Sequence, residues 1–168
     1  SSAASDVYKR QIHFREPMKL PKTIPLHTLE TFLSTIYAQI GNAKTEYQRK
    51  NALRDAAVAE LLFSSGIRIS ELCSLHPADV NLYDGIILIY GKGNKERRIQ
   101  IGNESVINIL KKYRDEFINE IKKCNYFFAN QNGKPLSDQS IRRMINKYCS
   151  LAEIEMHITP HMLSLIHI

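Results

Sequence analysis

The sequence has few cysteines and no long apolar runs. Its three cysteines, Cys73, Cys124 and Cys149, lie far apart and lack the paired spacing of a zinc site or a disulfide framework. This usage indicates a reducing compartment. No apolar run approaches the length of a membrane span and no secretory signal is recognisable, so we expect the protein in the cytoplasm.

Composition and charge indicate an ordinary globular protein with a basic character. Of the 168 residues, 43% are hydrophobic and 24% are charged, which suits one domain with a sizeable core. Lysine and arginine together number 23, against 17 aspartates and glutamates, so the formal net charge is +6. This excess of positive charge favours a polyanionic partner.

The apolar periodicity predicts a mainly helical fold with one small antiparallel hairpin sheet. One helix is expected to begin at Thr28, and a second to end at Gly66, because glycine can take the left-handed conformation of a helix exit. Two strand-forming runs at 86–90 and 97–101 predict the hairpin. Further helices are expected from Glu104 to about Ile121, after the capping residue Ser137, and from Thr159-Pro160.

Residues 65–72 form the first of two motifs that could carry chemistry. They read Ser-Gly-Ile-Arg-Ile-Ser-Glu-Leu and place Arg68 just past a helix end. The guanidinium of Arg68 cannot lose its charge, so among apolar neighbours it needs an anion. Two anions are possible: the carboxylate of Glu71, in a structural salt bridge, or a bound phosphate.

Residues 91–97 form the second motif. They read Gly-Lys-Gly-Asn-Lys-Glu-Arg, and Lys92 lies at the tip of the predicted hairpin. The two glycines allow a sharp turn, and Lys95, Arg97 and Arg98 make the segment net positive. It is not a nucleotide-binding P-loop, because the Gly-x-x-x-x-Gly-Lys-Ser/Thr pattern is absent. A basic hairpin that is simply solvated is the alternative to one that binds phosphate.

Together the two motifs resemble the first half of the active site of tyrosine recombinases, the family of phage integrases and Xer-type enzymes. The resemblance implies that Arg68 is the first of two catalytic arginines, that Glu71 orients it, and that Lys92 is the general acid. It also implies the mainly α catalytic core of DNA breaking and rejoining enzymes, which need no metal or other cofactor. The implied partners are double-stranded DNA, contacted by Lys95, Arg97 and Arg98, and other protomers in a tetramer on DNA.

A third landmark is Thr159-Pro160-His161, where the family pattern reads Pro-His-x-Leu-Arg. The resemblance makes His161 an active-site histidine. The position of the second arginine holds Ser164, and none of the eight tyrosines matches the family's nucleophile, which follows that arginine. His157 could suggest a metal pair with His161, but Pro160 and the helix start between them break the one-face geometry such a pair needs.

The helix after Ser137 carries cations opposite an apolar face. A solvated amphipathic helix explains this pattern, and the resemblance makes contacts with DNA an alternative. The cations are Arg142, Arg143 and Lys147. Three tyrosines fall on apolar faces and are expected in the core: Tyr37, Tyr113 and Tyr148.

The two ends of the chain differ from the rest. Residues 1–11 and 164–168 resemble translated adaptor sequence, so we expect a partial catalytic domain at 12–163; a natural tail is the alternative. Two functions stay open: a fragment of an active recombinase, or a DNA-binding module without activity. A basic helical domain unrelated to DNA would require the three landmarks to coincide by chance.

Overall fold

Helices form most of the structure. The computed structural model describes residues 13–14, 25–91, 93, 95–153 and 166–167. None of the helices in this part of the chain is long and apolar enough to cross a membrane. The helices are α2 (Leu26–Asn42), α3 (Glu46–Ser65), α4 (Ile69–Cys73), the short 3-10 helix η1 (Pro77–Asp79), α5 (Glu104–Glu116), α6 (Ile118–Cys124) and α7 (Asp138–Leu151).

The expected antiparallel hairpin is present and has a third strand. β3 (Ile86–Tyr90) pairs with β4 (Glu96–Gln100), and β2 (Val80–Asn81) pairs with the other edge of β3. The second hairpin strand therefore begins one residue earlier than the periodicity predicts. Separately, β1 (His13–Phe14) pairs with β5 (Ile166–His167) in a two-stranded sheet.

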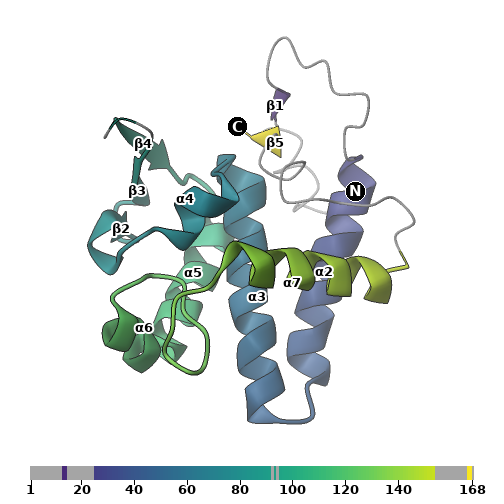
Figure 1. The fold of residues 1–168 in the computed structure, drawn as a ribbon. Coiled ribbons are helices and arrows are strands. Elements are labelled where there is room, and N and C mark those ends of the chain that lie inside the picture. Colours follow the sequence, from purple (N-terminus) through teal and green to yellow (C-terminus); the bar gives the residue numbers. More distant parts are fainter. Residues whose placement is uncertain (1–12, 15–24, 92, 94, 154–165, 168) are drawn as a thin grey trace.

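The helix α3 is the centre of the fold. Its residues from Asp55 to Ser64 are all buried, and α2, α5 and α7 surround it (Figure 1). Three alanines that are completely buried, Ala56, Ala57 and Ala59, let neighbouring helices come close. The helix ends at Gly66, which has a φ of 69° and donates its N–H to Leu62 O at 3.3 Å. The predicted helix exit is thus confirmed.

The predicted single helix from Glu104 is wrong, because the structure has two. The break lies at Phe117, which is fully buried with φ −105° and stacks on Tyr113 with the ring centroids 4.8 Å apart. The hydroxyl of Tyr113 donates to Phe127 O at 2.7 Å and accepts the N–H of Ala129 at 2.8 Å. The apolar stripe continues across the break, so periodicity alone does not reveal it.

Two buried carboxylates on α3 tie it to its neighbours. Asp55, 4% exposed, accepts a hydrogen bond from the Tyr148 hydroxyl of α7 at 2.8 Å and pairs with Arg54 at 3.0 Å. Glu60, 3% exposed, accepts one from the Tyr37 hydroxyl of α2 at 2.8 Å. Tyr148 is in the core as expected, but the prediction for Tyr37 is wrong: its ring lies at the edge and is 38% exposed.

Replacing Tyr148 with phenylalanine should destabilise the fold. The change removes the hydroxyl donor from a buried, charged carboxylate, which typically costs about 1–3 kcal/mol of unfolding free energy. For a chain of this size, that lowers the melting temperature by roughly 2–4 °C per kcal/mol. Thermal unfolding followed by circular dichroism measures the shift. Tyr47→Phe, on a ring that is 62% exposed, is the control and should leave the melting temperature unchanged.

Candidate functional site

The turn between α3 and α4 presents Arg68 to solvent. Ile67 and Ile69 on either side are buried, at 0% and 8% exposure, and anchor the turn in the core. Arg68 itself is exposed, with φ −76° and ψ 150°, and its carbonyl accepts the N–H of Leu72 at 2.9 Å to begin α4. In the described part of the chain, no carboxylate or carbonyl pairs with its guanidinium. The turn therefore holds a cation whose charge is available to a ligand.

Glu71 pairs with the hairpin rather than with the side chain of Arg68. Its carboxylate accepts both terminal nitrogens of Arg97, with Nη1 to Oε2 at 3.0 Å and Nη2 to Oε1 at 3.2 Å. The backbone N–H of Arg68 donates to the same carboxylate at 3.0 Å. Of the two anions considered for Arg68, the protein carboxylate is thus engaged by another arginine. Glu71 therefore contacts the backbone at Arg68 and not its guanidinium.

The electrostatics of Glu71 follow from these contacts. Partial burial opposes ionisation, but the hydrogen bonds from Arg97 and from the Arg68 backbone, together with both positive charges, outweigh it. The pKa of Glu71 is therefore below its usual 4.5. At neutral pH, the carboxylate is charged and the ion pair is complete.

The register of the hairpin separates two arginines that the sequence places side by side. Arg97 lies opposite Ile89, which is 1% exposed, while Arg98 lies opposite Leu88. Successive side chains of a strand point to opposite faces, so Arg97 faces α4 and Arg98 faces away from it. Gly91 N–H donates to Lys95 O at 2.9 Å at the base of the connecting segment, and Lys95 is exposed. Lys92, in that segment, is outside the described residues.

The predicted two-faced helix is confirmed as α7. Ser137 caps it by accepting the N–H of Ser140 at 3.1 Å. One face is buried, and the other exposes the three cations at positions 142, 143 and 147.

The start of α7 packs against α4, which contains Cys73. Burial and the carboxylate of Asp138 raise the pKa of the Cys73 thiol to about 12. This thiol is therefore not ionised at neutral pH, and its setting gives it no nucleophilic role.

The remaining sequence predictions concern residues outside the described part of the chain and the question of a metal site. His157 and His161 are outside the described residues, as are 1–11, 164, 165 and 168. Among the residues that are described, no three His, Cys, Asp or Glu side chains come together in a way that could hold a metal ion.

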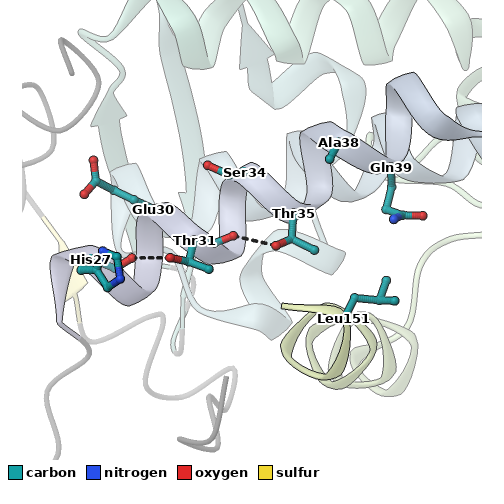
Figure 2. A pocket seen from close by; sticks show the side chains of 8 residues that line it. All are labelled: His27, Glu30, Thr31, Ser34, Thr35, Ala38, Gln39 and Leu151. Carbon is teal, nitrogen blue, oxygen red and sulfur yellow. Dashed lines mark hydrogen bonds between the residues drawn. The ribbon is translucent and has the colours of Figure 1, made fainter. Parts of the chain in front are cut away.

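A shallow groove lies away from this site, between α2 and the end of α7 (Figure 2). The hydroxyl of Thr31 donates to His27 O at 3.0 Å and that of Thr35 to Thr31 O at 2.8 Å, so both turn back to their own helix. None of the site residues predicted from the sequence lines the groove. It is lined by His27, Glu30, Thr31, Ser34, Thr35, Ala38, Gln39 and Leu151.

The contribution of Glu71 to stability should depend on pH in one direction. A carboxyl whose pKa is lowered by folding stabilises the fold above its unfolded pKa, and this contribution is lost as the pH falls through the folded value. Wild type should therefore melt at a higher temperature than Glu71→Gln at pH 7, and the difference should shrink as the pH falls below 4.5 and through the lowered pKa of the folded state. Melting curves of both proteins across this range test it. A difference that stays constant with pH would show that the charge of Glu71 is not involved.

Known proteins resemble this chain over most of its length. The model of the phage integrase family matches residues 32–164. A tyrosine recombinase of Agathobacter rectalis is 70% identical over 154 residues, which are 92% of this chain and 50% of the relative. Tyrosine recombinase XerD of Staphylococcus saprophyticus is 36% identical over 148 residues, 86% of this chain and 47% of the relative. The chain thus spans about half the length of the curated relatives it matches.

Solved structures share the fold. XerA recombinase superposes with a TM-score of 0.72 at 25% identity, over 86% of this chain and 48% of that one. XerH recombinase bound to a palindromic difH substrate, in a post-cleavage complex, superposes with a TM-score of 0.68 at 26% identity. The match covers 87% of this chain and 40% of that one. The expected fold class, a mainly helical core with a small antiparallel sheet, is confirmed. The family match spans most of this chain, and it contains both the Arg68 turn and the basic hairpin beside it. The chain therefore belongs to the phage integrase family of tyrosine recombinases.

Proposed function

We propose that this chain is the catalytic-domain portion of a site-specific recombinase that cuts and rejoins double-stranded DNA. In the full-length protein, a tyrosine oxygen attacks a DNA phosphorus, and the 5′ oxygen leaves with a proton to give a 3′-phosphotyrosyl link. A free 5′ hydroxyl later attacks the same phosphorus and releases the tyrosine. The observation that carries the proposal is the exposed guanidinium of Arg68, held beside the hairpin on an anchored turn, where no described residue pairs with it.

The proposed roles follow from the chemistry of each side chain. Arg68 stabilises the negative charge that develops on the phosphate, which is the contribution a preorganised cation makes in a transition state. Lys92 protonates the leaving 5′ oxygen, and His161 lies at the same phosphate. Glu71 holds the backbone at Arg68 through the N–H it accepts. These assignments rest on the family resemblance and on the geometry of the Arg68 turn.

The DNA contacts come from two elements in this proposal. Lys95 and Arg98 of the hairpin are exposed, and so are the three cations of α7. Such side chains neutralise phosphates without reading sequence. Arg97 is a separate case because its guanidinium is engaged by Glu71. The XerH structure, solved with a difH substrate, supports DNA as the partner. Assembly of four protomers on DNA in the cytoplasm completes the proposal.

A DNA-binding module without activity is the second candidate. It requires Ser164, which stands where the family pattern has its second arginine, to be the natural residue, whereas residues 164–168 resemble adaptor sequence. Tyr113 and Tyr148 are fully buried, with hydroxyls already hydrogen bonded, and burial raises the pKa of both. They are therefore unsuited to attack a phosphate.

The chain should bind duplex DNA with an affinity that falls as salt rises. Each neutralised phosphate contributes about 0.9 to the slope of log K against log salt concentration, so Lys95→Ala with Arg98→Ala should reduce the slope by about 1.8. Fluorescence anisotropy at several salt concentrations measures it. Lys112→Ala with Lys122→Ala, which removes the same charge from α5 and α6, should leave the slope unchanged. An unchanged slope for the hairpin variant would place DNA elsewhere on the molecule.

Replacing Arg68 with alanine should weaken DNA binding without destabilising the fold. The guanidinium has no hydrogen bond or ion pair with the part of the chain that the structure describes, so the unfolding free energy should change by less than about 0.5 kcal/mol. Loss of a charge-assisted phosphate contact should lower the affinity about tenfold. Arg49→Ala is the matched control, because Arg49 pairs with Glu46 and Glu116, and its loss should lower the melting temperature but not the affinity. A lower melting temperature with unchanged DNA affinity for Arg68→Ala would reject a phosphate-binding role.

A further inference from the structure

A single carboxylate joins the two segments of the proposed site. Glu71 accepts the backbone N–H of Arg68, before α4, and both terminal nitrogens of Arg97, in β4. The three contacts are 3.0, 3.0 and 3.2 Å long. The side chain of Glu71 is only 11% exposed, whereas that of Arg97 is 48% exposed. The carboxylate thus lies between the turn and the hairpin, with the arginine covering it from outside.

The hairpin also comes close to the same carboxylate at Gly91. A Cβ built on Gly91 would lie 3.9 Å from Glu71 Oε2, which is van der Waals distance. Gly91 is the residue before Lys92, and its N–H closes the connecting segment by donating to Lys95 O. The base of the connecting segment is therefore close enough to Glu71 that a single added carbon at Gly91 would touch the carboxylate.

We propose that Arg97 is a positioning residue: its guanidinium clamps the hairpin, through Glu71, to the turn that presents Arg68. This inference rests on the proposed function, since it assigns Arg97 to holding the two halves of that site together rather than to binding a DNA phosphate. Arg98, on the opposite face, has no hydrogen bond or ion pair among the described residues. In this proposal, Arg97 points inward and binds Glu71, whereas Arg98 points outward and contacts DNA.

The chemistry of the pair favours a clamp over a phosphate ligand. A planar guanidinium matches a carboxylate with two parallel hydrogen bonds, a geometry that a lysine cannot reproduce. If Arg97 turned to a phosphate, the carboxylate of Glu71 would stay mostly buried with one backbone N–H as its partner. Leaving a buried charge without its counter-ion is costly. The ion pair is therefore expected to persist when DNA binds.

Amide hydrogen exchange of the free chain, followed by NMR, tests the clamp without DNA. Arg97→Ala and Glu71→Gln should each speed exchange of the Gly91 amide by about threefold, the effect expected for a partly exposed ion pair. Glutamine keeps an oxygen that can accept the Arg68 N–H, so it removes the charge alone. Arg97→Lys should give an intermediate exchange rate, and Arg98→Ala should leave the exchange rate of the Gly91 amide unchanged. Unchanged Gly91 exchange in both clamp variants would overturn the proposal.

Salt titration of DNA binding separates positioning from direct contact. Arg97→Ala and Glu71→Gln should each lower the affinity about threefold with an unchanged salt slope, whereas Arg98→Ala should reduce the slope by about 0.9. A slope reduced by 0.9 for Arg97→Ala, or a higher affinity for Glu71→Gln because Arg97 is released, would make Arg97 a phosphate ligand and overturn the proposal. Failure of wild type to bind DNA would count against the proposed function, while the exchange rates would still decide whether the clamp exists.

Discussion

The structure depends on the burial of α3 on all sides. Ten consecutive residues of this helix, from Asp55 to Ser64, are buried, and α2 and α5 pack along it. Small side chains at Ala56, Ala57 and Ala59 allow the close approach, and the completely buried Leu61 and Leu62 fill the space around them. A helix held this firmly has a fixed end. The turn at Gly66 therefore delivers Arg68 to one place on the surface.

Polar contacts inside this core give the packing its orientation. Apolar side chains can pack in several ways, but a buried carboxylate must meet a donor. Asp55 accepts a hydrogen bond from Tyr148 of α7, and Glu60 accepts one from Tyr37 of α2, so each bond favours one orientation of its helix against α3. Because α7 carries the exposed cations on its other face, the hydrogen bond from Tyr148 and the burial of the apolar face of α7 together set the direction in which the cations point.

The site is assembled from segments that use different kinds of support. The Arg68 turn is anchored by apolar residues on both sides, and β3 of the hairpin is likewise anchored by the buried Ile87 and Ile89, whereas β4 reaches the turn through an ion pair at the surface. Burial holds the turn and β3 firmly, and a partly exposed ion pair holds β4 to the turn less firmly. The proposed clamp is thus the weaker of the two supports. This difference makes β4 the part of the site that single charge changes can shift.

Local sequence determined much of this protein. The helix exit at Gly66, the cap at Ser137, the strand at 86–90 and the two faces of α7 all follow from neighbouring residues, because backbone preferences and periodicity act within one or two turns. The two motifs also identified the family. Periodicity could not reveal the break at Phe117, since the apolar stripe runs through it unchanged.

Only the tertiary structure decided which charges meet. Glu71 has Arg68 three residues away and Arg97 far along the chain, and sequence spacing alone makes the near one the obvious partner. The antiparallel register brings Arg97 to the carboxylate and turns Arg98 away, because side chains alternate across a strand and the face that carries Arg97 is turned toward Glu71 of α4. Pairing between distant segments depends on how the elements dock, and the sequence around Glu71 does not reveal that Arg97 is its partner.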